Sequence, residues 1–290
     1  MKIAVNALLS CCLICLCTSF YPRQEWTDLL DKNLSKWEMY LGYRHKLGYK
    51  GEILKDEKGQ TIPPFGYNKN VNHVFSVIEE DGVPVLKISG EIYGCVYTKQ
   101  EFANYHLRLK VRWGRKKWPP RLDEDMDSGL LYHSIGDCGA DYWRAWMLSQ
   151  EFQINEKNFG DYWNIGNSRI TIKADQLADS TYRYSPTGSQ VSMGAGTAVK
   201  GYCRRSQDME KPQGEWNTID LICYGDKSLH IVNGQVVMAL SNSSWMDGNT
   251  VRPLTKGKLQ LQSEAAEVYY KEVQIKPIDR LPAEYAAYFK

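Results

Sequence analysis

The sequence lacks the motifs that mark nucleotide-binding and repeat proteins. It contains no P-loop, no glycine-rich dinucleotide fingerprint and no internal repeat, which argues against P-loop, Rossmann-type and solenoid folds. An excess of charge of one sign is also missing. The formal net charge is +2 over 290 residues, with acids and bases interspersed, so nothing indicates a nucleic-acid partner.

The one basic stretch is followed at once by acids that offset it. Its members are Arg112, Arg115, Lys116, Lys117 and Arg121, and the acids are Asp123, Glu124, Asp125 and Asp127. We interpret the two groups together as a solvated loop rather than as a phosphate site. The spacing of the three aspartates resembles the start of a calcium loop. A glycine comes one position late, however, and Ser134 stands where the closing glutamate is needed, so we dismiss a calcium loop.

Cysteine is scarce outside the first twenty residues. Four of the eight cysteines lie at positions 11, 12, 15 and 17, which leaves Cys95, Cys138, Cys203 and Cys223. These four show no C-x-x-C spacing, which argues against a thiolate zinc site and a dithiol redox motif. Four cysteines allow three pairings, and the sequence does not choose between them.

The N-terminal residues predict export. Lys2 precedes a stretch of apolar and small residues at 3–19, and Ser19 supplies a small side chain for cleavage. We therefore expect an export signal at 1–19 and one domain at 20–290. Leu8-Leu-Ser-Cys11 also resembles a bacterial lipobox, so lipidation at Cys11 stays open. The predicted location is the periplasm or, as a lipoprotein, the outer membrane of a bacterium, with membrane contact only through that anchor and with disulfides permitted.

Short runs of alternating or β-branched residues predict an all-β chain. The clearest run is Tyr105–Trp113, in which apolar and basic residues alternate, and Asn233-Gly234 indicates a tight hairpin between two further runs. About a dozen such runs, separated by turn residues, favour a two-sheet jelly-roll sandwich. We expect long loops at 43–70 and 178–214 and a short helical strap at Pro282–Lys290.

One strand carries the pattern E-x-Q-x-x-E, formed by Glu151, Gln153 and Glu156. Alternate residues of a strand point to the same face, so Glu151 and Gln153 share a face, and Glu156 lies opposite unless a bulge intervenes. Aromatic residues surround the pattern at Trp143, Trp146, Tyr162 and Trp163. Carboxylates and an amide among such rings indicate a sugar-binding cleft. The alternative is an edge strand with a solvated polar face.

Six segments, in order, resemble the 3-keto-disaccharide hydrolase family, also described as 3-keto-glucoside 1,2-lyase and 3-keto-2-hydroxyglucal hydratase domains. They cover about residues 25–278 and read WTDLLDKNLSKW, NYHLRLKVRWG, DSGLLYH, QEFQI with GDYW, GEWNTIDLICYGDKSLHIVNG and GKLQLQSEAAEVYYKEVQIKPI. The resemblance implies a concanavalin A-like sandwich. The chain departs from the family at Lys110, at Ser263-Glu264, where an acid and a histidine are expected, and at Tyr270-Lys-Glu272.

The resemblance implies an activity on glycosides that are already oxidised to a ketone at C3. A base removes the acidified C2 proton, the substituent at C1 leaves, and water adds to the resulting 2-hydroxyglucal. This chemistry requires a general base, stabilisation of the enolate oxygen and an acid for the leaving group. No cofactor is certain; a divalent metal can serve at the enolate, with His133 and Glu151 as candidate ligands.

We assign Glu151 as the base, His133 as the acid or metal ligand, and Glu156 or Asp161 as a second carboxylate. The predicted substrate contacts are Gln153, Lys110, Arg144, Trp146 and Trp163. Gln153 would hydrogen-bond a hydroxyl or the enolate, the two cations would hold the ketone oxygen, and the indoles would stack on sugar rings. We expect Glu151, Gln153 and His133 to line one concave pocket.

Two other functions stay open, a non-catalytic carbohydrate-binding domain and a structural sandwich without a sugar site. The E-x-Q-x-x-E pattern also resembles the E-x-D-x-x-E signature of laminarinase-type retaining glycosidases. In those enzymes an aspartate lies between two carboxylates that act as nucleophile and acid. Gln153 replaces that aspartate and cannot exchange a proton, so ordinary retaining hydrolysis is the weaker interpretation.

Overall fold

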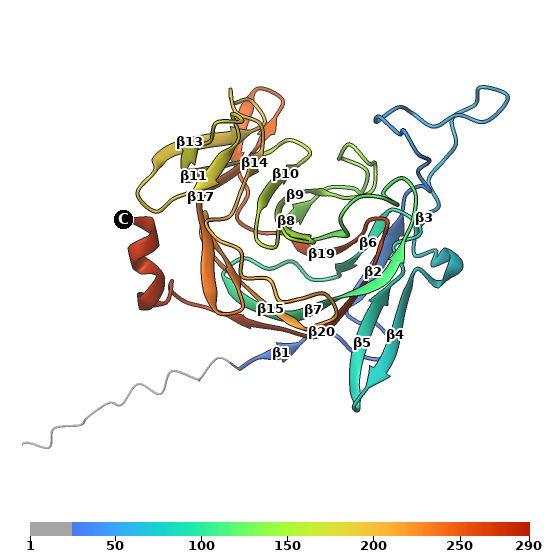
Figure 1. Ribbon diagram of the computed structural model, residues 1–290, viewed down its shortest axis with the longest axis horizontal. Coiled ribbons are helices and arrows are strands. Elements are labelled where there is room, and N and C mark those ends of the chain that lie inside the picture. The colour runs from blue at the N-terminus through green and yellow to red at the C-terminus, as the bar shows by residue number, and fades with distance from the viewer. Residues whose placement is uncertain (1–24) are drawn as a thin grey trace, which may run out of the picture.

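The computed structural model describes residues 25–290, which form two antiparallel sheets packed face to face (Figure 1). The predicted all-β jelly-roll sandwich is confirmed. The N-terminal stretch 1–24, with the predicted export signal and Cys11, lies outside the described residues. Within 25–290 no helix has the length and apolar character needed to cross a membrane.

Sheet A contains twelve strands, of which β15, β7 and β20 lie along the bottom of Figure 1 while β17, β11 and β13 rise at its left. Nine of them run in the order β12-β11-β17-β16-β15-β7-β20-β5-β4, and β1, β13 and β18 pair at the sides. Their bounds are β1 Thr27–Asp28, β4 Phe75–Glu80, β5 Val83–Ile88, β7 Tyr105–Lys117, β11 Ser168–Gln176, β12 Tyr182–Tyr184, β13 Ser189–Gly194, β15 Asn217–Tyr224, β16 Lys227–Val232, β17 Gln235–Asp247, β18 Thr250–Pro253 and β20 Ala266–Pro277.

Sheet B contains eight strands in the order β14-β10-β9-β8-β19-β6-β2-β3. Their bounds are β2 Trp37–Leu41, β3 Gly66–Tyr67, β6 Gly94–Thr98, β8 Asp127–Ile135, β9 Leu148–Asn155, β10 Tyr162–Ile165, β14 Tyr202–Cys203 and β19 Lys258–Ser263. Every recorded pairing between these strands is antiparallel. Since neighbouring strands keep their side chains in register, polar residues at alternate positions form rows across the sheet.

The main core lies between the two sheets. On β7 the residues Leu107, Leu109 and Val111 point inward, and on β9 Phe152 and Ile154 do so; all five are almost completely buried in one cluster. The alternation predicted for Tyr105–Trp113 therefore sets the inner face of sheet A. Because strand side chains alternate, the odd-numbered residues of β9, which include Glu151 and Gln153, point to the outer face of sheet B.

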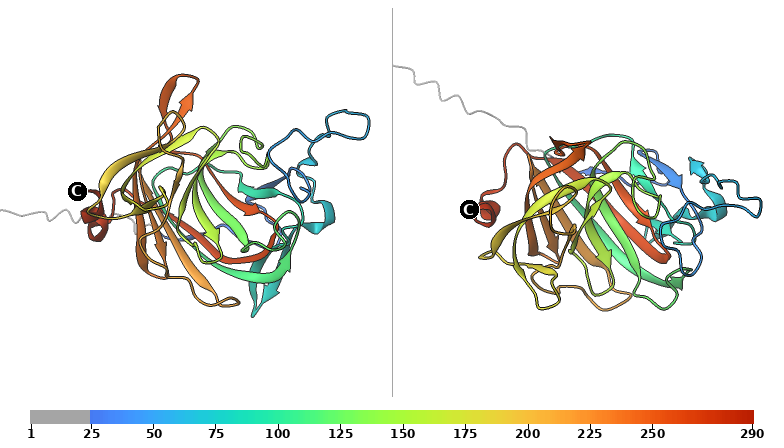
Figure 2. Two further views of the ribbon diagram at one scale, coloured as in Figure 1. Left: turned by 45° about the horizontal axis from the view of Figure 1, so that its top comes forward. Right: turned by 90° about the horizontal axis from the view of Figure 1, so that it is seen from above.

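The connections differ from the predicted loops in one place. Residues 43–70 form a long excursion, with only the short β3 inside it, as expected (Figure 2). The segment 178–214, expected to be a loop, contributes three short strands, β12, β13 and β14. These strands lie at or beside sheet edges. They are too short to show a clear alternation of apolar and polar residues, so the sequence did not predict them. The expected C-terminal strap is a 3-10 helix, η2 Ala283–Phe289, which packs on a second apolar cluster; η1 Val71–His73 is the other described helix.

Candidate active site

Three strands of sheet B, β9, β8 and β19, align their outward residues in rows. The first row is Asn155, Asp127 and Glu264, the second is Gln153, Gly129 and Gln262, and the third is Glu151, Leu131 and Gln260. Asn155 is half-buried, and the other side chains of the three rows are almost completely buried. A polar face of a sheet that is hidden from bulk water needs another source of hydrogen bonds. This polar grid is therefore unusual for a surface and marks a site.

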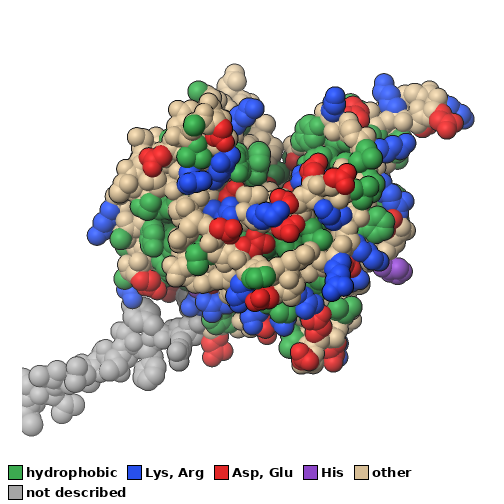
Figure 3. Space-filling view, viewed as in Figure 1, with side chains coloured by type: hydrophobic (Ala, Val, Ile, Leu, Met, Phe, Trp, Pro, Cys, Tyr) green, Lys and Arg blue, Asp and Glu red, His purple; other side chains and the backbone are tan. Residues whose placement is uncertain are grey.

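The first two rows and Glu151 of the third form the floor of a cavity of about 480 Å³ on the outer face of sheet B. Walls are supplied by β10, by Tyr202 of β14 and by the cavity loop, which we define as residues 136–147 between β8 and β9. Figure 3 shows the molecule notched on this side, with acidic and basic side chains gathered below the notch. The size suits a small ligand such as one or two sugar rings.

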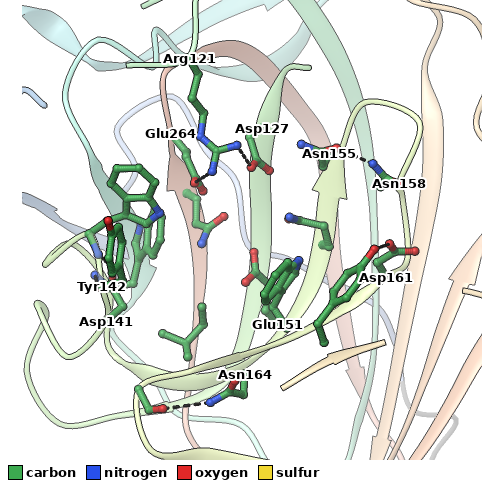
Figure 4. Close-up of a pocket in the computed structure, with 18 residues that line it drawn as sticks. Arg121, Asp127, Asp141, Tyr142, Glu151, Asn155, Asn158, Asp161, Asn164 and Glu264 are labelled. Atoms are coloured by element: carbon green, nitrogen blue, oxygen red, sulfur yellow. Dashed lines mark hydrogen bonds and ion pairs between the residues drawn. The ribbon is translucent and has the colours of Figure 1, made fainter. Parts of the chain in front are cut away.

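Glu151 lies at the centre of the floor (Figure 4). Its carboxylate leans over Gly129, because a Cβ built on Gly129 would come within 2.2 Å of Glu151 Oε1 and 2.4 Å of Gln262 Oε1. The absence of a side chain at Gly129 thus lets the Glu151 carboxylate and the Gln262 amide converge over this residue. Burial raises the pKa of Glu151 well above its usual range, and the carboxylates of Glu264 and Asp127 raise it further. Such a carboxylate is a stronger proton acceptor than an exposed one.

Arg121 holds two carboxylates at the other end of the floor. Its guanidinium lies 2.5 Å from Asp127 Oδ2 and 2.9 Å from Glu264 Oε1, and it covers the Trp143 ring at 5.5 Å (Figure 4). Burial raises the pKa of Asp127 to about 6, against the opposing effect of Arg121. Burial, together with Asp127, also raises the pKa of Glu264 well above its usual range. The interpretation of this stretch as a solvated loop is wrong for Arg121 and Asp127, because both side chains are largely buried and paired.

Several buried polar atoms of the floor have no hydrogen-bond partner within residues 25–290. They are both amide atoms of Gln262, Oδ1 of Asp127 and Nε of Arg121. A buried polar atom that stays unpaired costs about 1–3 kcal/mol. Because these atoms cluster in one cavity, a polar ligand with several donors and acceptors would relieve them together.

The wall at β10 is fixed by Asp161. Its carboxylate accepts hydrogen bonds from Tyr202 Oη at 2.8 Å, from the Arg205 backbone N–H at 2.9 Å and from Arg205 Nη1 at 3.1 Å. Burial raises its pKa, although these three donors oppose the rise. Beside it, Gln153 lines the cavity and its Oε1 accepts the backbone N–H of Ile154 at 3.1 Å. Asp161 therefore orders the wall, and its oxygens are already engaged.

Two exposed aromatic rings stand at the rim. Trp163 is 40% exposed and lies against Tyr202, with ring centroids 4.4 Å apart. Tyr142, which the sequence analysis did not single out, is 52% exposed. Asp141 builds the turn beneath it by accepting the backbone N–H groups of Trp143, Ala145 and Trp146 at 2.6–2.8 Å. Trp146 also lines the cavity but is buried, with its Nε1 bonded to Gly94 O, so its role is packing.

The expectation that His133 shares the cavity with Glu151 is wrong. The ladder between β8 and β9 is irregular after Tyr132, and His133 has φ of 53°, so its side chain leaves the alternation. The ring is buried against Tyr105 and Tyr132, and its Nδ1 lies 2.9 Å from Leu254 O. Burial lowers its pKa to about 4. A local bulge, which no residue pattern signalled, thus removes this candidate from the site.

Three other candidates also lie away from the cavity. Lys110 is on the outer face of sheet A and pairs with Glu272 at 2.8 Å. Arg144 Nη2 donates to Gly51 O at 3.0 Å, and Glu156 Oε2 accepts the Met126 N–H at 3.3 Å. Each of these side chains serves local structure, so none is placed to contact a ligand of the cavity. Glu156 was assigned from spacing, but β9 ends at Asn155.

The described residues do not form a site for the divalent metal considered in the sequence analysis. Nowhere in 25–290 do three or more His, Cys, Asp or Glu side chains come together in a geometry that could hold an ion. Glu151 and His133, the two candidate ligands, are not neighbours in the site. The chemistry below is accordingly built from side chains only.

Two groups of residues that sequence reasoning missed had a readable signal. The run KLQLQSE alternates strictly, so Gln260, Gln262 and Glu264 had to share one face of their strand. Asp127 and Gly129 are likewise two apart in the segment DSGLLYH. Arg121 had no local signal, because its role depends on the chain folding back over β8 and β19.

Buried carboxylates, unpaired amide atoms and rim aromatics on a β-sandwich fit a carbohydrate-active protein. A model of the 3-keto-alpha-glucoside-1,2-lyase-like domain matches residues 25–276. The chain belongs to this family, which confirms the resemblance seen in the sequence. Among curated proteins, none matches the chain.

Solved structures are similar at low identity. A glycosyl hydrolase candidate from Parabacteroides distasonis is 19% identical with a TM-score of 0.47, covering 88% of this chain and 100% of that one. A β-glucanase from Bacillus licheniformis is 9% identical with a TM-score of 0.40, covering 88% and 98%. The carbohydrate-binding module CBM66 from Bacillus subtilis is 7% identical with a TM-score of 0.38, covering 70% and 91%. At these values they say nothing about the ligand of this chain.

Proposed function

We propose that the cavity binds a glycoside oxidised to a ketone at C3 and that Glu151 removes its C2 proton. The observation that carries this proposal is the convergence of the Glu151 carboxylate and the unpaired Gln262 amide over Gly129, on the floor of the cavity. A sugar ring in the cavity would meet a base and an unpaired donor at once. Family membership supports the same substrate class.

The two free donors of the floor suit the enolate that forms at the C3 oxygen. Gln262 Nε2 and Arg121 Nε are buried and unpaired, so they would bind an oxyanion without first giving up another partner. Such preorganised donors act where charge develops and contribute strongly in a site that excludes water. Arg121 also keeps its two carboxylate partners in place.

We assign Asp127 to the leaving group. Its Oδ1 has no partner, and its pKa of about 6 lets it both give and take a proton near neutral pH. In the elimination, Glu151 takes the C2 proton and Asp127 protonates the departing C1 oxygen, which releases an alcohol and a 2-hydroxyglucal. In the hydration, Asp127 takes a proton from water as it adds at C1, and Glu151 returns its proton to C2. The net reaction consumes one water.

The test is turnover of a 4-nitrophenyl 3-keto-glucoside by the purified protein, with release of 4-nitrophenol and 3-keto-glucose followed together. Glu151→Gln keeps the shape of the side chain but cannot accept the proton, so kcat should fall by about 10²–10⁴-fold. Lys110→Ala, on the other sheet, is the matched control and should keep full activity. Full activity in Glu151→Gln would refute the assigned base.

A non-catalytic carbohydrate-binding role is the second candidate, and the exposed rings of Trp163 and Tyr142 favour it. Aromatic rings at a rim stack on unoxidised and oxidised sugars alike. Calorimetric binding of an unoxidised oligosaccharide, together with no turnover of the 3-keto-glucoside by the unaltered protein, would select this role over the enzyme.

A further inference from the structure

Two thiols meet beside the cavity. Cys95 Sγ, on β6, lies 3.9 Å from Cys138 Sγ, at the start of the cavity loop. The two residues are 43 positions apart in the chain, and both are free in this structure. A disulfide has an S–S length of about 2.05 Å, so a shift of roughly 2 Å separates the present contact from a covalent bond.

The other two cysteines of the described chain are not placed to compete. Cys203 belongs to the second apolar cluster and Cys223 to the main core between the sheets. Both are buried, and Cys203 Sγ contacts the Arg204 carbonyl at 3.6 Å. Within 25–290, Cys95 and Cys138 are the one pair of thiols in contact. The structure thus separates the three pairings that the sequence leaves equal.

The surroundings allow the sulfur atoms to approach. Cys138 is half-buried and lies between Gly136 and Gly139, which have φ of 76° and 97°. A Cβ on Gly136 would touch nothing within 4 Å, so this side of the turn has room to move. Cys95 is fully buried and its Sγ lies 3.2 Å from Gln260 Oε1. The moving partner is therefore Cys138, which is also the thiol that a reagent can reach.

The C-terminal end of the cavity loop also contacts Gln260, the residue beside Cys95. The backbone N–H of Met147 donates to Gln260 Oε1 at 3.1 Å, the oxygen that also faces Cys95. Between the two ends lie Asp141, Tyr142 and Trp143, which line the cavity. A bond at Cys138 would fix the first end of the loop to β6, while hydrogen bonds already hold the second.

We propose that Cys95 and Cys138 form a disulfide that ties the cavity loop to β6. The thiolate of Cys138 attacks one sulfur of a small disulfide such as oxidised glutathione, whose S–S bond breaks and releases one thiolate. Cys95 then loses its proton and attacks Cys138 Sγ, which releases the second thiol. The two protein thiols are oxidised by two electrons, and the small disulfide is reduced to two thiols. This bond is independent of the reaction proposed for the cavity.

The test uses the full chain, reduced and then incubated in its folded state with oxidised glutathione. Remaining thiols are blocked with N-ethylmaleimide in denaturant, and peptides are mapped without reduction. The expected result is a Cys95–Cys138 linked peptide as the main product, and a rise in melting temperature of roughly 5–15 °C for a loop of this length. Recovery of both cysteines as maleimide adducts, or a bond from Cys138 to one of the N-terminal cysteines, would overturn the proposal.

Variants separate the two steps. In Cys95→Ser the mixed disulfide of Cys138 with glutathione should accumulate, because no second thiol can release it. In Cys138→Ser neither the link nor the rise in melting temperature should appear, and Cys95 should stay free because it is buried. Cys223→Ser is the matched control, and its retention of the link is expected. If Cys95→Ser does not fold, Cys138→Ser, which alters the more exposed residue, still decides the result through its melting temperature.

Discussion

The outer faces of the two sheets carry similar polar and charged residues, but within the described chain these residues have partners on sheet A, and several of them lack partners on sheet B. On sheet A, the outward residues of β7 are His106, Arg108, Lys110 and Arg112. All four lie within 2.9 Å of an acid: the first two meet Asp220, the third Glu272 and the fourth Glu80. The pairs of Lys110 and Arg112 are partly exposed and Asp220 is buried, but every one of these charged groups has a partner. Sheet A is therefore a satisfied surface, which needs no ligand to complete its hydrogen bonds.

On sheet B the same kind of alternation produces an unsatisfied surface. One cation, Arg121, serves two carboxylates, and Glu151 has no cation at hydrogen-bonding distance among the described residues. The amide of Gln262 is buried and unpaired. The difference shows that alternation alone does not make a site. A site arises where a wall and a loop cover the polar face, so that burial raises the cost of every unpaired group.

Replacing one cation on each face, Arg121 on sheet B and Lys110 on sheet A, should give the largest contrast in stability. Arg121→Met leaves Asp127 and Glu264 buried without their partner, and breaking a buried pair in this way costs about 3–5 kcal/mol. Lys110→Met removes a partly exposed pair on sheet A, where the cost is about 0–1 kcal/mol. Urea unfolding of both variants at neutral pH measures the difference. Equal losses in the two variants would contradict the proposed contrast between the faces.

The pH dependence of stability should have opposite signs on the two faces. Burial raises the pKa of Asp127 from its ordinary 3.8 to about 6, so the folded protein binds more protons than the unfolded chain between these values. This contribution to stability is complete below pH 4 and is lost as the pH rises through 6. It amounts to roughly 3 kcal/mol at 1.36 kcal/mol per pKa unit. Asp127→Asn should make the fall less steep, as measured by urea unfolding at pH 4 to 7, while Glu151 and Glu264, whose pKa values burial also raises, keep the rest of it.

Glu267 on sheet A is the matched control for that titration. Burial works to raise its pKa, but the Arg115 N–H and Lys87 outweigh it, so the net pKa is lowered. Its contribution is present above the ordinary pKa of 4.5 and is lost as the pH falls, the reverse of Asp127. Glu267→Gln should therefore reduce stability at neutral pH and leave the fall between pH 4 and 6 in place. If the free energy of unfolding falls equally steeply with pH in Asp127→Asn and in the unaltered protein, the raised pKa of Asp127 does not contribute to the fall.

The parts of this contrast that depend on one strand could be predicted from the sequence. Alternation places Glu151 with Gln153, and the inner face of β7 with the core, because a strand has a fixed period of two. The expected sandwich follows from the same runs. What one strand cannot show is which neighbour covers it, so nothing distinguished the satisfied face, with Lys110, from the unsatisfied one.

The failures have local physical causes. His133 follows an irregularity in β8 and takes a positive φ, which turns its ring into the core against the expected alternation. Arg121 reads as one of several loop cations, since its two partners, Asp127 and Glu264, are brought beside it only when β8 and β19 pair. Bulges and contacts between distant strands leave no mark in a short residue pattern, and both decide which side chains enter the cavity.

The convergence of Glu151 and Gln262 over Gly129 can be disturbed without changing any charge. Gly129→Ala adds a methyl group at a position that lies 2.2 Å from Glu151 Oε1 and 2.4 Å from Gln262 Oε1. Both side chains must move apart, so we expect the affinity for a 3-keto-glucoside to fall by about tenfold or more, a loss of roughly 1.4 kcal/mol. Isothermal calorimetry with Glu151→Gln as the background measures binding without turnover.

Gly114 offers a control with the same kind of overlap on sheet A. A Cβ there would come within 2.3 Å of Glu267 Oε2, so Gly114→Ala also displaces a carboxylate. It should leave the affinity for the sugar unchanged, because that carboxylate faces away from the cavity. A similar loss of affinity in both variants would mean that general strain, and not the displacement of Glu151 and Gln262, explains the result.

The smallest effect on sugar affinity is expected for Trp163, at the rim of the cavity. Trp163→Ala removes an exposed ring that rests on Tyr202, and aromatic contacts of this kind contribute about 0.5–1.5 kcal/mol, or roughly 2–12-fold in affinity. Trp216→Ala is the control, because its ring is covered by Arg112 and Lys271 on sheet A. Calorimetry should show weaker sugar binding only for Trp163→Ala, at unchanged melting temperature. Loss of affinity in the sheet A variant would instead place a sugar site on the satisfied face.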